Sequence, residues 1–286
     1  MTHAARANRR YVTVLVLAIA LTFGFLALTR APWFAPQAYA DATSDAPPFR
    51  GRAAVADLRD TRALVLVNRD HKLGAKKASG LTKAWPTVPV RATDIKLEKT
   101  ALAAAKKMFA AAREAGAGSF YVTSGYHSRA AQKKIYAKAA DKSYVQPPGF
   151  SEHETGFAAD ILADKLHQDE FAASEPGRWL AEHSWEYGFV LRYPDDKQGA
   201  TGISYESWHF RYVGTPHAWY CERNHLAFEE YIDALRSGLR YSVRLDGTEY
   251  TVGREKPRGG KIGVPEDQNY AVSSDNTGGY IVTAWR

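Results

Sequence analysis

The sequence predicts an α+β protein in which helices flank a small antiparallel sheet and a small β extension follows at the C-terminus. Helical patterns predominate early in the folded region, and short strand patterns predominate later, which favours α+β over a doubly wound sheet. The length of 286 residues corresponds to one or two domains. Hydrophobic residues make up 45% and charged residues 24%. This ordinary globular composition excludes a disordered chain, a collagen and a coiled coil.

An apolar segment lies near the N-terminus. Residues 11–28 carry no charge, and as a helix they would reach about 27 Å, enough to span a bilayer core. Arginines precede this segment, which indicates a cytoplasmic N-terminus. Residues 38–40, Ala-Tyr-Ala, fit a signal-peptide cleavage site. We therefore expect residues 1–40 to be a membrane anchor or a cleaved signal peptide, and the rest of the chain to be extracytoplasmic.

The charge and the cysteine content exclude several classes of protein. The formal net charge is +7, and four of the positive charges are arginines within residues 1–40. The remainder shows no basic stripe interleaved with aromatic residues, so we expect no nucleic-acid partner. The single cysteine, Cys221, excludes an intrachain disulfide and a CxxC metal site. We expect a monomer.

Residues 41–59 contain two prolines, several Ala and Asp residues and one Ser, and we expect them to link the N-terminal segment to a domain at 60–238. In this domain the apolar run 63–68 predicts a strand, and residues 70–92 look irregular. A helix is predicted from Thr93 or Asp94 to residue 115, ended by Gly116. The other expected elements are strands over 119–123, 157–162, 189–193 and 208–213 and helices over 129–140, 178–187 and 216–235.

After Gly238 the pattern changes to strands only. Residues 241–245 and 248–252 flank Asp246-Gly247, which predicts a hairpin. Further strands are expected over 270–272 and 280–284. The extension, residues 239–286, is too small to bury much apolar surface alone, so we expect it to pack on the main domain.

Two polar clusters carry the candidate chemistry. The first, residues 151–160, contains His153 and Asp160, and the second, residues 205–209, contains Glu206 and His209. Two histidines and one carboxylate are a common open zinc set. A further carboxylate beside the metal can act as general base. Because positions 206 and 209 face opposite sides of an ideal strand, the backbone must bend there or Glu206 must lie in the preceding loop.

These residues also have structural interpretations. His153, between two glutamates, could lie in a solvated loop, and Asp160 could cap a neighbouring helix. However, a carboxylate within an apolar run is costly unless it is paired or bound to metal. His209, between Trp208 and Phe210, is likewise costlier than a surface histidine. We assign structural or surface roles to the other candidate histidines, His71, His167, His183, His217 and His225.

At these clusters the sequence resembles the LAS-type zinc peptidases, and among them the VanY-type D,D-carboxypeptidases. The resemblance rests on S-x-H-x-x-G-x-A-x-D over residues 151–160 and E-x-W-H over residues 206–209. Supporting matches follow in order over roughly residues 60–236, namely Ser124-Gly125-Tyr126, Gln132, residues 147–150, 188–194, 201–203, 211–214, 216–217 and 228–231.

The resemblance implies one Zn²⁺ per chain, held by His153, Asp160 and His209. Glu206 would deprotonate the zinc-bound water and then protonate the leaving amine. The implied substrates are peptidoglycan stem peptides that end in D-Ala-D-Ala, from which the last D-Ala is released. The expected substrate contacts are Ser151, Gln132, Tyr193, His127 and Arg129.

Position 127 departs from the family pattern. The family usually has arginine directly after Ser-Gly-Tyr, whereas this chain has His127, followed by Arg129. Histidine cannot copy the bidentate fork that arginine offers to a carboxylate. In an extended segment, positions 127 and 129 point the same way, so Arg129 could reach the same site.

Two alternatives stay open. The same zinc machinery would serve a D,D-dipeptidase or an L,D-carboxypeptidase. A non-catalytic cell-wall-binding module is disfavoured because all four key residues are present. A serine D,D-peptidase does not fit, since the chain contains no Ser-x-x-Lys, and residues 274–276, Ser-Asp-Asn, are then interpreted as a turn. The role could be wall maturation or glycopeptide resistance.

Overall fold

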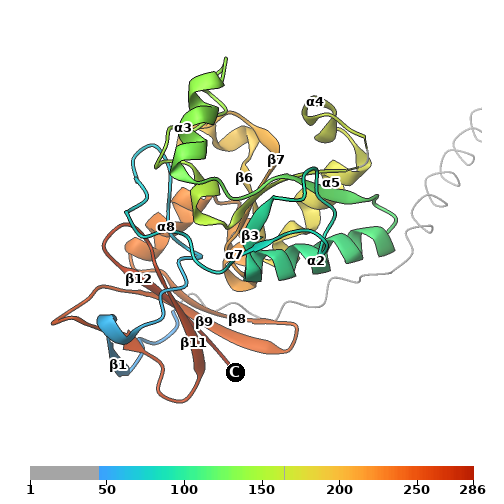
Figure 1. Cartoon of the computed structure of the whole chain (residues 1–286). Coiled ribbons are helices and arrows are strands. Elements are labelled where there is room, and N and C mark those ends of the chain that lie inside the picture. The colour runs from blue at the N-terminus through green and yellow to red at the C-terminus, as the bar shows by residue number, and fades with distance from the viewer. Residues whose placement is uncertain (1–44, 164) are drawn as a thin grey trace, which may run out of the picture. The chain divides into compact units, whose positions relative to one another are not determined.

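The computed structural model describes residues 45–163 and 165–286. The apolar segment 11–28 and the cleavage pattern at 38–40 lie outside the described residues. Within the described ranges, no helix is both long and apolar enough to cross a membrane. All described residues belong to a single unit, and its mixture of helices and antiparallel sheets confirms the α+β prediction (Figure 1).

A four-stranded antiparallel sheet forms the centre of the first part of this unit. Its strands lie in the order β4 (Phe120–Ser124), β5 (Ala158–Ala163), β7 (Glu206–Tyr212) and β6 (Phe189–Tyr193). The apolar core on this sheet combines strand residues such as Ile161 and Phe210 with residues of the helices α2 (Lys99–Glu114) and α5 (Glu175–His183), among them Met108 and Leu180. Strands β5 and β7 are therefore packed against the apolar side chains of these two helices.

Helix α2 (Lys99–Glu114) begins later than residue 94 because a short strand precedes it. Lys96–Glu98 forms β3 and pairs with β2 (Leu81–Lys83). The Glu98 carboxylate then accepts a hydrogen bond from the backbone N–H of Thr100 at 2.6 Å, which caps the helix. The other short elements of this part are α3 (Arg129–Lys138), α4 (Gln168–Phe171), α5 (Glu175–His183), α6 (Gln198–Thr201) and the 3-10 helices η1 (Val55–Asp57), η2 (Glu152–Thr155), η3 (Ser184–Tyr187) and η4 (Asp195–Lys197).

The prediction of one helix over 216–235 is wrong, because the chain forms two helices there. Helix α7 (Thr215–Arg223) ends before His225, whose φ of 52° is left-handed. Helix α8 (Phe228–Arg236) then begins after Ala227, whose N–H donates to the Glu230 carboxylate at 2.7 Å. A left-handed residue cannot continue a helix, so the apolar periodicity extends across a break.

The strand expected over 63–68 is also wrong. Residues 64–68 are buried, but the segment pairs with no strand of the described chain. Leu64 and Leu66 pack into one apolar cluster, whereas Val65 and Val67 pack into another with Leu73. Burial on both sides explains the apolar run without any strand partner.

The C-terminal part contains a second antiparallel sheet in the order β11-β12-β9-β8. The expected hairpin is confirmed: Asp246 and Gly247 join β8 (Arg240–Leu245) to β9 (Thr248–Glu255) and have φ values of 47° and 77°, as a type I′ turn requires. The strands of this region are β8 (Arg240–Leu245), β9 (Thr248–Glu255), β10 (Lys261–Val264), β11 (Asn269–Ser274) and β12 (Tyr280–Trp285).

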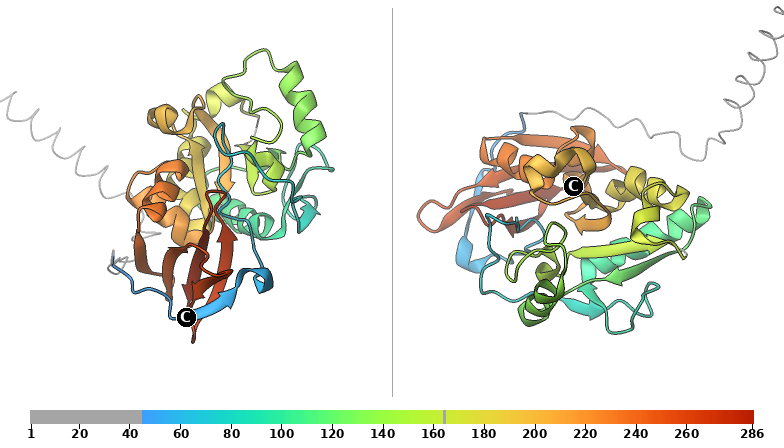
Figure 2. Two further views of the ribbon diagram at one scale, coloured as in Figure 1. Left: turned by 90° about the vertical axis from the view of Figure 1, so that its left-hand side faces the viewer. Right: turned by 90° about the horizontal axis from the view of Figure 1, so that it is seen from above.

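Part of the expected linker belongs to this C-terminal region. Gly51–Ala54 forms β1 and pairs antiparallel with β10, and Figure 2 shows β1 beside the second sheet. The linker interpretation is therefore wrong for residues 51–54. The cause is long-range pairing with a partner about 200 positions away, which local composition does not reveal.

The second sheet packs on α7 and α8, as expected of a small extension. One apolar cluster combines Phe228 and Ile232 of α8 with Val243, Val252 and Ile281 of the second sheet. The extension thus covers the apolar faces of α7 and α8, in a cluster that also includes Val190 of β6. The domain division at residue 238 stays a prediction.

Candidate metal centre

Two neighbouring strands and one 3-10 turn bring three potential ligands together. Asp160 of β5 and His209 of β7 are register partners across the sheet. His153 lies in η2, just before β5. The chain turns from η2 into β5 at Gly156, whose φ is 85° and where a Cβ atom would come within 2.7 Å of Leu81. Glycine is therefore required at this turn.

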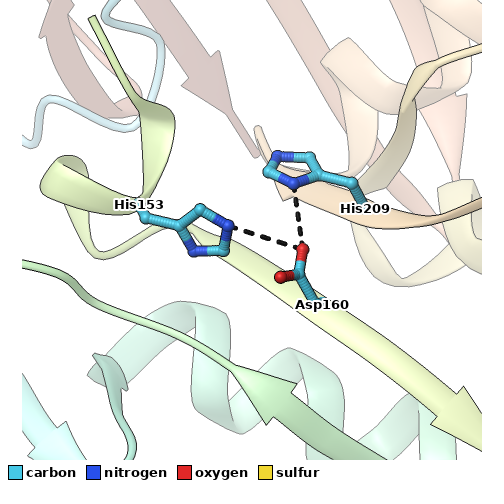
Figure 3. A group of neighbouring side chains, drawn as sticks. All are labelled: His153, Asp160 and His209. Carbon is cyan, nitrogen blue, oxygen red and sulfur yellow. Dashed lines mark hydrogen bonds and ion pairs between the residues drawn. The ribbon is translucent and has the colours of Figure 1, made fainter. Parts of the chain in front are cut away.

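Both imidazoles of this group face the same carboxylate oxygen (Figure 3). Oδ1 of Asp160 lies 3.4 Å from Nε2 of His153 and 3.0 Å from Nδ1 of His209. One ligand atom from each residue lies within 4.8 Å of the others. This spacing is that of a group able to hold a single metal ion.

On each imidazole the nitrogen atom that faces away from Asp160 lies near an oxygen acceptor. Nδ1 of His153 donates to the carbonyl oxygen of Gly125 at 2.6 Å, which leaves Nε2 as the free lone pair of the neutral ring. Nε2 of His209 lies 3.7 Å from Oε2 of Glu152. Zinc-binding histidines typically have such a carbonyl or carboxylate on the other nitrogen. Two imidazoles and a carboxylate fit a zinc ion with an open position.

Glu152 belongs to a buried network of two arginines and two carboxylates. Oε1 of Glu152 accepts hydrogen bonds from Nε of Arg192 and Nη1 of Arg211, each at 2.9 Å. Arg192 also forms a bidentate pair with Glu229, at 2.8 and 2.5 Å. Burial acts to raise the pKa of Glu152, but the charges of Arg192 and Arg211 outweigh it and hold that pKa well below its usual range. The network thus presents a carboxylate to His209.

Glu206 lies beside the three residues, as the first residue of β7. Its Oε2 is 3.6 Å from Nδ1 of His209. Of the two arrangements expected, the bend is the one present: β6 pairs Leu191 with Phe210 but Tyr193 with Glu206, a register shift that leaves extra residues on β7. Such a bulge turns the side chains of 206 and 209 toward one site.

Burial raises the pKa of Glu206 to about 8, and the negative charges of Asp160 and Glu152 act in the same direction, while His209 opposes them. A cation bound at the neighbouring site would favour the carboxylate form. A carboxyl group whose proton affinity lies in this range is suited to accept and return a proton.

The four residues line a cleft of about 1090 Å³. The same cleft is lined by four of the residues expected to contact substrate, namely Ser151, Gln132, His127 and Tyr193. The motif spacing therefore predicted residues that the fold brings to one place. Their individual roles stay predictions.

His127 is held in the cleft as a neutral ring. Its Nδ1 donates to Oε1 of Gln132 and its Nε2 accepts from Oγ of Ser124, both at 2.9 Å. The ring stacks on His153, with 4.6 Å between centroids. Burial, with a further contribution from His153, lowers the pKa of His127 to about 4. His127 therefore supports His153 and supplies no positive charge.

The expectation that Arg129 reaches the cleft is wrong. Residue 129 begins helix α3 instead of continuing an extended segment, so its side chain takes another direction. Its Nε donates to Glu154 and its Nη2 to the carbonyl oxygen of Leu73, each at 2.9 Å. Arg129 is not among the residues that line the cleft.

Sequence reasoning missed the buried network behind His209. It treated Glu152 only as a flanking charge, whereas its side chain is fully buried. The available signal was a pair of arginines within the apolar strands at 189–193 and 206–212. Buried arginines require carboxylate partners, and these two point to Glu152.

The fold and this site define a class: a metal-dependent hydrolase with two histidines, one aspartate and a neighbouring glutamate. A family model described as VanY, D-alanyl-D-alanine carboxypeptidase, matches residues 94–215. A bifunctional D-Ala-D-Ala dipeptidase and carboxypeptidase, VanXYC of Enterococcus gallinarum, is 38% identical over 128 residues, 41% of this chain and 67% of that protein. The chain belongs to the VanY carboxypeptidase family of zinc-dependent peptidases.

A D-alanyl-D-alanine carboxypeptidase of Enterococcus faecium is 35% identical over 171 residues, which are 59% of this chain and 55% of that protein. The match therefore spans about half of that relative's length.

Two solved structures are similar over most of their own length. The D,D-dipeptidase VanXYg, bound to a D-Ala-D-Ala phosphinate analog, has a TM-score of 0.69 and 29% identity, and the match covers 78% of this chain and 94% of that one. A VanY D,D-pentapeptidase variant in complex with Zn(II) has a TM-score of 0.51 and 34% identity. The match covers 59% of this chain and 98% of that one.

Proposed function

We propose that this protein is a zinc-dependent D,D-carboxypeptidase that removes the terminal D-Ala from peptidoglycan stem peptides ending in D-Ala-D-Ala. The observation that carries this proposal is the group of His153, Asp160 and His209 in one cleft with Glu206, whose carboxylate lies 3.6 Å from His209. Membership of the VanY family supports the substrate class.

His153, Asp160 and His209 would hold one Zn²⁺ through Nε2, Oδ1 and Nδ1. Bound there, zinc would polarise the scissile carbonyl and lower the pKa of a water molecule to about 7. Glu206 accepts a proton from the attacking water while the water oxygen forms a bond to the scissile carbonyl carbon. When the peptide C–N bond breaks, Glu206 returns that proton to the leaving nitrogen of D-Ala.

The surrounding residues orient these groups. Glu152 fixes the His209 ring from behind, and His127 stacks on His153. Tyr193 lies over His209, with 4.8 Å between ring centroids. Ser151, Gln132 and Tyr193 contact the substrate from the cleft wall. The Gln132 amide also donates to the carbonyl oxygen of Gln146 at 2.7 Å. Its first role is therefore to stabilise the side of the cleft that these two residues line.

A related specificity is the second candidate. VanXYC of Enterococcus gallinarum is described as both a dipeptidase and a carboxypeptidase. The LD-carboxypeptidase LdcB is similar in structure, with a TM-score of 0.55 and 31% identity, over 66% of this chain and 94% of that one. The same metal site would serve either reaction, so substrate length separates the candidates.

The wider setting follows from the substrate. Stem peptides lie outside the cytoplasmic membrane, so we place this protein there, with residues 1–40 as its anchor or signal peptide. We propose residues 60–238 as the catalytic domain, residues 239–286 as a packed β extension, and a monomer as the working form. Either wall maturation or glycopeptide resistance is compatible with the reaction.

The test uses the full chain in detergent, loaded with Zn²⁺ and incubated with a stem pentapeptide and a tetrapeptide, with a chelator control. Product masses identify the bond that is cut. Chelator-sensitive loss of one D-Ala from the pentapeptide alone is the expected result. Cleavage of the tetrapeptide, or release of the D-Ala-D-Ala dipeptide, would assign the second specificity. Absence of cleavage despite one tightly bound zinc would contradict both and favour a wall-binding module.

A further inference from the structure

The proposed substrate ends in a carboxylate, and the cleft must compensate that charge. Among the described residues that line the cleft, Arg91 is the one with a permanent positive charge. This inference rests on the proposed function, and it concerns how the terminal carboxylate is recognised.

Three further arginines, which are not among the residues lining the cleft, are already paired. Arg129 is engaged by Glu154 and by the carbonyl oxygen of Leu73. Arg192 and Arg211 are fully buried and bound to Glu152. Arg192 and Arg211 cannot meet a substrate without breaking buried ion pairs, which is strongly unfavourable.

The backbone at Arg91 is fixed against the central sheet. Its N–H donates to the carbonyl oxygen of Val122 at 2.8 Å, and the N–H of Val122 donates to Pro89 at 3.0 Å. Residue 90 forms a parallel bridge with Val122. Residues 89–91 therefore run along the free edge of β4 like an added strand. The origin of the Arg91 side chain is fixed, while its far end is free.

This placement sets the distance to the metal centre. Val122 pairs with Ile161, the neighbour of Asp160. Arg91 thus lies two strand spacings from Asp160 on β5, about 10 Å between backbones, and His209 on β7 lies one spacing further. The terminal residue of a peptide extends about 3.5 Å beyond the scissile bond. The long side chain of Arg91 spans much of the remaining distance to the metal centre. Thr123, which lines the cleft, lies between them.

The Arg91 guanidinium has no partner of its own. The side chain is exposed, and among the described residues no hydrogen bond or ion pair involves its guanidinium. A planar guanidinium binds a carboxylate through two parallel hydrogen bonds. We propose that Arg91 binds the C-terminal carboxylate of the peptide substrate and makes the enzyme a carboxypeptidase.

The test compares an acyl-D-Ala-D-Ala peptide with its C-terminal amide, using the zinc-loaded full chain and the variants Arg91→Ala and Arg91→Lys. The acyl group carries no carboxylate. For Arg91→Ala we expect kcat/KM on the acid to fall about 10- to 100-fold, mainly through KM, with little change on the amide. Arg91→Lys should recover part of the preference. Arg113→Ala, an exposed arginine on α2 outside the cleft lining, is the matched control.

An equal acid-to-amide ratio in the wild type and Arg91→Ala would overturn the proposal. A second comparison identifies which carboxylate Arg91 binds. If Arg91→Ala lowers kcat/KM for the full stem pentapeptide but not for the acyl-D-Ala-D-Ala peptide, Arg91 binds a carboxylate upstream of the C-terminus. That result would also overturn the proposal.

Binding provides a readout that does not depend on turnover. Calorimetric titration of acid and amide into zinc-loaded Glu206→Gln, with and without Arg91→Ala, should show the same loss of preference for the acid. If the wild type cleaves neither peptide but this preference depends on Arg91, the proposed reaction fails and the role of Arg91 stands. If cleavage occurs and binding of the acid does not depend on Arg91, the role of Arg91 fails alone.

Discussion

Two buried histidines, His209 and His217, occupy opposite chemical environments. Their exposed fractions are 4% and 3%. His209 lies within 3.7 Å of three carboxylates, those of Asp160, Glu206 and Glu152. The ring nitrogens of His217, in α7, lie against hydroxyl groups, those of Tyr231 at 2.6 Å and Thr283 at 2.9 Å.

Burial acts to lower the pKa of both rings. Around His209 the hydrogen bond to Asp160 and the nearby carboxylates of Glu152 and Glu206 outweigh burial and raise the pKa to about 10. Around His217 burial acts unopposed and lowers the pKa to about 3. Burial alone therefore does not mark a functional histidine; the charge of its neighbours does. The environment of His209 is suited to a cation. His217 is a neutral ring that connects α7 to α8 and to the second sheet through its hydrogen bonds.

The largest effect is expected from Glu206→Gln, which removes the proton acceptor of the acidic environment. General acid–base catalysis typically contributes about 10²- to 10⁴-fold, so kcat should fall by that factor. Bound zinc, measured by elemental analysis, should stay near the wild-type level. Substantial remaining turnover in the zinc-loaded variant would remove Glu206 from the role of proton carrier.

The next effect concerns Glu152, which faces Nε2 of His209. Glu152→Gln should weaken zinc binding about 10- to 100-fold, because such outer partners orient the ligand ring. Competition with a chromogenic chelator measures this affinity.

Glu229→Gln is the matched control for Glu152→Gln, since Glu229 binds Arg192 in the same network but does not face His209. It should lower the thermal stability while leaving zinc affinity near that of the wild type. Equal losses of affinity in both variants would show that Glu152 acts only through stability.

The neutral environment of His217 predicts a pH-dependent stability. Its pKa is about 3 when folded and about 6.5 when unfolded, so below pH 6.5 protons bind preferentially to the unfolded chain. The stability that His217 contributes is complete above pH 6.5 and is lost progressively toward pH 3. At pH 5 the free energy of unfolding should be lower by about 2 kcal/mol for this reason.

Urea unfolding at pH 7, 6 and 5 tests this, with His217→Gln beside the wild type. The variant should show the shallower decline. His225→Gln is the control, because His225 is exposed and its ion pair with Asp196 lies at the surface, where such pairs contribute little. Parallel curves for wild type and His217→Gln would contradict the assignment.

The smallest effect is expected from Tyr241→Phe. The Tyr241 hydroxyl donates to the carbonyl oxygen of Pro216 and contacts the Tyr231 hydroxyl, both at 3.0 Å. Its loss should lower the free energy of unfolding by about 1 kcal/mol without changing kcat/KM. Tyr270→Phe, at an exposed position, should change neither. A fall in activity of Tyr241→Phe would link the extension to the metal centre.

Local patterns predicted much of the fold and the candidate site. The hairpin at Asp246-Gly247 could be predicted because few residues accept its left-handed turn. The bend between Glu206 and His209 could be predicted because strand geometry has a period of two. The break at His225 could not, since apolar periodicity continues across it. The run at 63–68 was misread because burial on both sides resembles a strand.

The residue types and spacings of the chain thus determined its family, its α+β class and the side chains that meet in the cleft, because these depend on short-range geometry and ligand chemistry. The tertiary structure decided the charge of those side chains. It paired Arg129 with Glu154, kept His127 neutral beside Gln132 and placed Glu152 behind His209. Electrostatic environment depends on neighbours that are distant in sequence, and only folding brings them into contact.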